Sequence, residues 1–132
     1  MYKYLHLFSG IGAFEAAVSK SKSFRCVGYS EIDEDALVVY RKHYPDHLYL
    51  GDVREISSKT LFDMKVDIVV AGFPCTDVST MKRIRCTESK RGLRAGGQSS
   101  LFLYMLDIME KLLKHNPRLH IIVENVVSME RA

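Results

Sequence analysis

The stretch that decides the fold is Asp67-Ile68-Val69-Val70-Ala71-Gly72-Phe73-Pro74-Cys75. Its first part is continuously apolar, as expected for a strand that is covered on both faces of a sheet. Gly72 and Pro74 end that strand and place one cysteine on the loop that leaves it. A second apolar run, Leu119-His120-Ile121-Ile122-Val123, ends in Glu124-Asn125-Val126. A nucleophile after one strand and a carboxylate after another predict a covalent catalytic site.

Short apolar runs alternate with amphipathic ones along the rest of the chain, which is the pattern of βαβ units. The sequence therefore predicts an α/β fold with an incomplete parallel sheet of about five strands and flanking helices. The expected strands cover residues 5–8, 26–30, 48–50, 66–71 and 119–123, and the expected helices cover residues 13–19, 34–43, 57–63 and 100–115.

Length and composition are those of one ordinary soluble domain. The chain has 132 residues, of which 47% are hydrophobic and 27% charged. No run is long enough to cross a membrane, and no signal peptide is recognisable. Three cysteines, Cys26, Cys75 and Cys86, are too few and too scattered for a disulfide framework or a zinc site. We therefore expect a cytoplasmic protein without a metal.

Positive charge is concentrated in one segment, between Asp77 and Gln98. Six basic and two acidic side chains give this segment a net charge of +4, against +3 for the whole chain. Such a run is often a solvated loop. Its position just after Cys75 favours a loop that contacts phosphates. The basic residues are Lys82, Arg83, Arg85, Lys90, Arg91 and Arg94.

Polar or glycine residues follow each expected strand, where open parallel sheets bind ligands. They are Gly10 and Gly12, Glu31, Asp52, Cys75 and Glu124. The turn from Phe8 to Gly12 would let a ligand approach the backbone. Glu31 could accept hydrogen bonds from ribose hydroxyls or could be an exposed surface residue. Ile32 could cover an adenine or pack in the core, and Asp52 could accept from the adenine amino group or cap a turn.

Glu15 stands where the third glycine of a dinucleotide-binding turn would be. A carboxylate there matches a pyrophosphate poorly, which favours an adenosine ligand without phosphates. Cys75 lies outside its strand, where a cationic loop and backbone amides could stabilise its thiolate. Cys26 is expected in the core, and Cys86 is expected to be an incidental loop thiol. Glu124 must be satisfied by Asn125 and backbone groups or be poised for a ligand.

Taken together, these residues resemble the cytosine carbon-5 DNA methyltransferase family. The ordered motifs are Leu7-Phe8-Ser9-Gly10-Ile11-Gly12, Glu31, Gly51-Asp52-Val53, Gly72-Phe73-Pro74-Cys75 and Glu124-Asn125-Val126. The resemblance implies a Rossmann-like methyltransferase fold that binds S-adenosyl-L-methionine. By the same resemblance, the cofactor-binding residues are Phe8, Gly10, Gly12, Glu31, Ile32, Asp52, Val53, Pro74 and Leu101.

The resemblance also implies the chemistry. A cytosine is flipped out of double-stranded DNA into the pocket. Cys75 attacks carbon 6 while Glu124 engages the N3 edge of the ring, and carbon 5 then becomes nucleophilic enough to take a methyl group. Asn125 holds the Pro74-Cys75 loop, and the basic segment closes over the DNA.

The sequence departs from the family's pattern in several places. His6 stands where the family usually has aspartate, Ala13 replaces a glycine, and Thr76 replaces a glutamine. The chain also has no counterpart of the target-recognition domain or of the carboxy-terminal motifs. We therefore expect residues 1–132 to be a partial catalytic domain, inactive alone. It would associate with a complementary carboxy-terminal chain, or with itself, through the strand near Ile121.

Two other functions fit the same motifs. The first is a family member that methylates transfer RNA. The second is a non-catalytic module that binds S-adenosylmethionine for regulation. The sequence of this part of the chain leaves both open.

Overall fold

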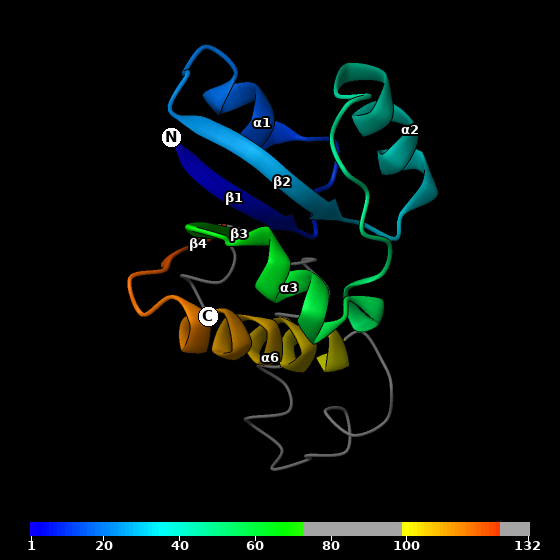
Figure 1. Ribbon diagram of the computed structural model, residues 1–132. Coiled ribbons are helices and arrows are strands. Elements are labelled where there is room, and N and C mark those ends of the chain that lie inside the picture. The colour runs from blue at the N-terminus through cyan, green and yellow to red at the C-terminus, as the bar shows by residue number, and fades with distance from the viewer. Residues whose placement is uncertain (73–98, 125–132) are drawn as a thin grey trace, which may run out of the picture.

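The computed structural model describes residues 1–72 and 99–124, with the side chains of residues 99 and 100 left out (Figure 1). Its strands are β1 (Tyr2–Leu7), β2 (Phe24–Ser30), β3 (Ile68–Gly72) and β4 (His120–Glu124). Its helices are α1 (Ala13–Val18), α2 (Glu34–His43), α3 (Ser58–Met64) and α6 (Ser99–His115), with a short 3-10 turn, η1 (Val53–Glu55). The predicted α/β class and each predicted helix are confirmed.

The described strands form one parallel sheet in the order β2-β1-β3-β4. The prediction of a separate strand at residues 48–50 was wrong. These residues make one isolated bridge, Tyr29 to Tyr49. The Tyr29 N–H donates to the Leu48 carbonyl over 3.0 Å, and the Leu50 N–H donates to the Tyr29 carbonyl over 2.9 Å. The pairing stops there because Gly51 takes a left-handed φ of 81° and turns the chain away.

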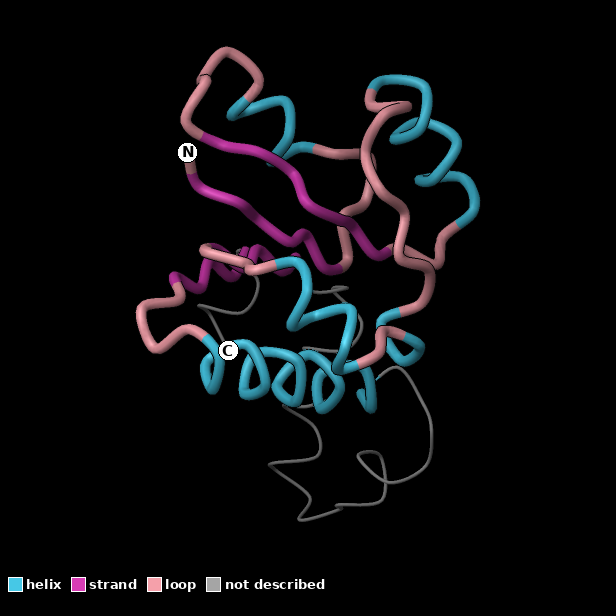
Figure 2. Tube along the Cα trace, viewed as in Figure 1, coloured by secondary structure: helices cyan, strands magenta, loops and turns pink. Residues whose placement is uncertain are grey.

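Two layers of helices enclose the sheet (Figure 2). Alternate residues of the central strands point to opposite faces. Leu5, Leu7, Val69 and Ala71 face a core completed by α3 and α6, whereas Tyr4, Ile68 and Val70 pack with Phe14 and Val18 on the α1 side. Figure 1 shows α1 and α2 above the sheet and α3 and α6 below it. Among the described residues, no helix is long and apolar enough to span a membrane.

Local caps explain why α2 and α3 begin where they do. The Asp33 carboxylate accepts hydrogen bonds from the backbone N–H groups of Asp35 and Ala36, at 3.0 and 3.4 Å. The Ser57 hydroxyl accepts from the Thr60 N–H at 3.1 Å. Such caps satisfy amide groups that have no partner within the helix. The Asp33 cap starts α2 at Glu34, so that only Glu31, Ile32 and Asp33 lie between it and the end of β2.

Candidate active site

The turn after β1 has an alternating left-handed backbone. The φ angles are 54° at Phe8, 59° at Gly10 and 92° at Gly12. A left-handed backbone is unusual for a bulky residue, and such strain is concentrated at functional sites. A Cβ on Gly10 would meet no atom within 4 Å, whereas one on Gly12 would lie 2.9 Å from the Tyr44 ring. The turn therefore presents an open face at Gly10 and is packed tightly behind Gly12.

Glu31 joins this turn to the loop after β2. One of its carboxylate oxygens accepts a hydrogen bond from the Gly10 N–H at 2.7 Å. The other accepts from the N–H groups of Ile32 and Asp33, at 2.8 and 3.1 Å. Glu31 is half-buried, and the Ile32 side chain beside it is 51% exposed. The structure thus places an acceptor and an exposed apolar side chain together at the mouth of the turn.

Asp52 caps η1, one of the two roles expected for it. Its carboxylate accepts a hydrogen bond from the Arg54 N–H at 2.9 Å and forms an ion pair with the Arg54 guanidinium. These hydrogen bonds from Arg54 hold the pKa of the Asp52 carboxyl below its ordinary value. Val53 and Leu101 are both buried in the core on the α3 and α6 side. Cofactor contacts for these three residues stay predictions.

Glu124 also lies at the carboxyl ends of the strands, beside the last residue of β3. It is the register partner of Gly72 across the β3–β4 pair. A Cβ on Gly72 would lie 3.4 Å from the Phe8 carbonyl oxygen and 3.8 Å from a carboxylate oxygen of Glu124. Gly72 therefore lies between the turn after β1 and the carboxylate at the end of β4.

Several predicted site residues lie outside the described residues. Among the candidate catalytic residues these are Cys75 and Asn125, and among the cofactor residues Pro74. The same holds for all the predicted DNA contacts: Lys82, Arg83, Arg85, Lys90, Arg91 and Arg94. Their roles stay predictions. The described part of the site brings together Phe8, Gly10, Glu31 and Ile32 at the turn, and Gly72 and Glu124 next to it.

Comparison with known proteins identifies the family of the chain. Residues 2–131 match the C-5 cytosine-specific DNA methylases. The chain belongs to this family. It is 30% identical over 129 residues to the type II methyltransferase M.HpaII of Haemophilus parainfluenzae, covering 98% of this chain and 32% of that enzyme. It is 36% identical over 125 residues to the orphan methyltransferase M.Rho11sI of Bacillus phage rho11s, covering 92% of this chain and 22% of that enzyme.

Solved structures of methyltransferases share the fold. The chain superposes on a Spodoptera frugiperda DNMT2 mutant with a TM-score of 0.71 and 22% identity, covering 100% of this chain and 38% of that one. It superposes on Entamoeba histolytica EhMeth with a TM-score of 0.69 and 18% identity, covering 100% of this chain and 40% of that one. The chain therefore has the fold of these proteins, and it spans about a third or less of the curated relatives named above.

The structure also shows a group of buried polar side chains in this family member that sequence reasoning missed. The Glu15 carboxylate is 2% exposed and contacts His6 and the Tyr40 hydroxyl. The carboxylate is turned inward and does not face a ligand at the turn. The sequence argument, in which this carboxylate opposes a pyrophosphate bound at the turn, assumed that it did. These residues are far apart in sequence, and no local pattern predicts that they meet.

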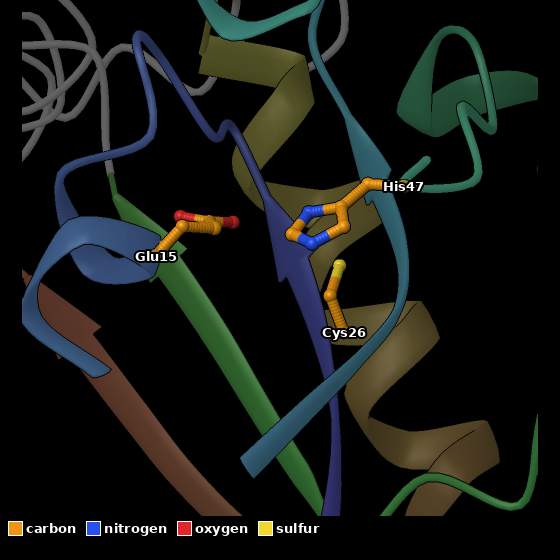
Figure 3. A group of neighbouring side chains, drawn as sticks. All are labelled: Glu15, Cys26 and His47. Carbon is orange, nitrogen blue, oxygen red and sulfur yellow. The ribbon is translucent and has the colours of Figure 1, made fainter. Parts of the chain in front are cut away.

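Glu15, Cys26 and His47 converge from α1, β2 and the loop after α2 (Figure 3). Their nearest ligand atoms lie within 4.8 Å of one another. The Tyr40 hydroxyl is 2.9 Å from both Glu15 and His47 and 3.9 Å from the Cys26 sulfur. Burial raises the pKa of the Cys26 thiol to about 11, so it stays protonated near neutral pH. The Tyr40 hydroxyl thus links the three side chains of this cluster.

Proposed function

We propose that this chain is the cofactor-binding and nucleophile-bearing portion of an S-adenosylmethionine-dependent DNA cytosine-5 methyltransferase. The placement of Glu124 against Gly72 carries the proposal. Cys75 follows Gly72 by three residues, which span at most about 10 Å when extended. A cytosine whose N3 edge contacts Glu124 would therefore be within reach of the Cys75 sulfur.

The described residues suit an adenosine ligand. Gly10 has an open face, Ile32 offers an apolar surface, and Glu31 offers carboxylate oxygens to the hydroxyls of a ribose. The Ser9 hydroxyl is buried without a hydrogen-bond partner among the described residues. An orphaned buried hydroxyl beside an open glycine is what a polar ligand group would satisfy. S-adenosylmethionine, when bound there, would supply an electrophilic methyl group.

The chain's own residues would then act as follows. The Cys75 thiolate would form a bond to carbon 6 of cytosine while Glu124 engages N3, where protonation lets the ring hold the electron pair displaced from the carbon 5–carbon 6 double bond. Carbon 5 becomes nucleophilic and takes the methyl group. Loss of the carbon-5 proton then breaks the bond between Cys75 and carbon 6 and restores the ring. Asn125 would hold the loop that carries the cysteine.

The same proposal names the partners and the setting. Double-stranded DNA would contact the basic segment between residues 77 and 98. A carboxy-terminal region, on this or another chain, would add strands beyond β4 and select the target sequence. Relatives from Bacillus phages and from bacteria support a cytoplasmic protein of prokaryotic or phage type.

Covalent trapping tests this function. The protein is expressed from DNA that includes the sequence downstream of its own coding region. It is then incubated with S-adenosylmethionine and a duplex containing 5-fluorocytosine. Fluorine cannot leave carbon 5 as a proton does, so the enzyme stays attached to the DNA. We expect a denaturation-resistant adduct that is lost in Cys75→Ser and retained in Cys86→Ser. An adduct in both variants, or none in the wild type, would overturn the proposal. An adduct that forms with a 5-fluorocytosine RNA and not with the DNA duplex would favour the transfer-RNA methyltransferase instead.

A further inference from the structure

A buried chain of polar side chains lies directly behind the glycine-rich turn. His6 is 3% exposed, Glu15 is 2% exposed and Tyr40 is fully buried. The His6 Nδ1 atom is 2.7 and 3.0 Å from the two Glu15 carboxylate oxygens. The Tyr40 hydroxyl donates to Glu15 at 2.9 Å and lies 2.9 Å from the Nδ1 atom of the half-buried His47. Side chains from β1 and α2 therefore meet at the carboxylate from α1, and the loop after α2 joins them through Tyr40.

The hydrogen-bond directions in this network follow from the chemistry of its members. An ionised Glu15 only accepts, so His6 must donate from Nδ1. The Tyr40 proton is directed at Glu15, so His47 must donate from its own Nδ1 to the Tyr40 oxygen. His47 thus donates to Tyr40, and Tyr40 donates to Glu15. Each hydrogen bond polarises the next and strengthens it in the low-dielectric interior.

The network encloses the turn that would hold the cofactor. His6 belongs to the end of β1 and Glu15 to the first turn of α1, so their contact closes the intervening residues 7–14 into a loop. The Tyr40 ring also packs on Gly12, where an added Cβ would lie 3.1 Å from it. Tyr40 therefore holds the turn twice, by its ring at Gly12 and by its hydroxyl through Glu15.

We propose that Tyr40 is a positioning residue for S-adenosylmethionine binding, acting through Glu15 on the turn from Phe8 to Gly12. This inference rests on the proposed function. The hydroxyl fixes Glu15 and hence the start of α1, so that the open face of Gly10 and its N–H, bound to Glu31, keep the geometry that accepts the ligand. His47 supports the Tyr40 hydroxyl from the protein surface.

Tyr40→Phe tests the proposal because it removes the hydroxyl and keeps the ring against Gly12. S-adenosylmethionine binding is measured by equilibrium dialysis, well below the melting midpoint of each variant. We expect the dissociation constant to rise about tenfold, the factor that corresponds to losing one hydrogen bond to a charged group. Tyr4→Phe is the matched control, since Tyr4 is equally buried beside Cys26 but does not contact Glu15 in any described hydrogen bond. It should leave the dissociation constant unchanged.

A pair of variants at His47 gives a second, milder test. Asn can place an N–H near the position of the histidine Nδ1 atom, whereas Leu cannot. We expect His47→Leu to weaken binding and His47→Asn to retain it. A purely structural network would lower the melting temperature but would leave the affinity of the folded protein unchanged. Equal dissociation constants for wild type, Tyr40→Phe and His47→Leu would therefore overturn the proposal.

Hydrogen exchange separates this proposal from the function on which it rests. Tyr40→Phe should speed amide exchange at Gly10 and Gly12 and leave Val69 and Val70 in β3 unchanged. If wild-type protein fails to bind S-adenosylmethionine, the proposed cofactor is wrong, whatever the exchange shows. If it binds and the affinity is unchanged in Tyr40→Phe and His47→Leu, the positioning role is wrong, whatever the exchange shows, and the function stands.

Discussion

Glu124 faces Gly72 across the β3–β4 pair, and its carboxylate lies 3.8 Å from the place that a Gly72 Cβ would occupy. The nearest other atom to that place is the Phe8 carbonyl oxygen, at 3.4 Å. One glycine thus separates the turn after β1 from the proposed catalytic carboxylate.

The first prediction concerns the size of residue 72. A Cβ fits at ordinary contact distances, so Gly72→Ala should fold and gain about 0.5 kcal/mol of stability in chemical denaturation by restricting the unfolded chain. Gly72→Val places an isopropyl group between Phe8 and Glu124 and should reduce formation of the 5-fluorocytosine adduct. Equal adduct yields for the alanine and valine variants would show that Glu124 does not need this space.

The second prediction contrasts the two glycines of the turn. Both have left-handed backbones, which cost an alanine about 1 kcal/mol. Gly12→Ala also collides with the rings of Tyr40 and Tyr44, so it should lose clearly more stability than Gly10→Ala. Gly10→Ala should remain folded and lose affinity for S-adenosylmethionine. Melting curves and equilibrium dialysis on the pair check this, and a Gly10→Ala protein with wild-type affinity would contradict an open ligand face at Gly10.

The third prediction concerns the link between the two loops. Glu31→Ala removes the acceptor for the N–H groups of Gly10, Ile32 and Asp33. We expect a loss of about 1–3 kcal/mol of stability and weaker binding of S-adenosylmethionine. Glu34→Ala is the control, because Glu34 is exposed at the start of α2 and close in sequence. Similar losses of affinity in both variants would indicate a general charge effect.

The fourth prediction concerns pH. Burial lowers the pKa of His47 below its ordinary value of 6.5. The unfolded chain therefore takes up a proton at His47 before the folded chain does, and stability falls as the pH drops below 6.5. His47→Asn has no such group. Urea midpoints from about pH 7.5 to about pH 5.5 should fall more steeply for wild type than for His47→Asn. Parallel curves would show that His47 is not held neutral by the fold.

The fifth prediction concerns the open edge of the sheet. Ile121, Ile122 and Val123 in β4 are 42–45% exposed, and β4 has no further neighbour among the described strands. An apolar edge of this kind promotes pairing with another strand. Light scattering should show concentration-dependent association that Ile122→Lys suppresses, with Val38→Lys on exposed α2 as the control. Association unaffected by Ile122→Lys would place the contact elsewhere.

Local signals predicted most of this fold. The α2 boundaries were correct because Asp33 caps the helix from within its own sequence and Pro45 lies just beyond it. The strand at residues 48–50 was not correct, because strand pairing depends on a distant partner and Gly51 allows only one bridge. For the site, parallel topology brings the described residues Gly10, Glu31 and Glu124 to the carboxyl ends of the strands, as expected from the sequence, and their roles stay predictions. The network of Glu15, Tyr40 and His47 was not found, since nothing near these residues in sequence marks their contact.

The bridge between Tyr29 and Tyr49 has a consequence for how this sheet can grow. Residues 48–50 cover the outer edge of β2, and the Leu50 side chain fills the space beside Gly28, where a Cβ would approach it to 2.7 Å. Residues 48–50 thus cover the outer edge of β2 around Gly28 and Tyr29. Among the described strands, β4 has an outer edge without a neighbour, so we expect a further strand to pair there. A strand that pairs with β4 would lie beside the strand that ends in Glu124.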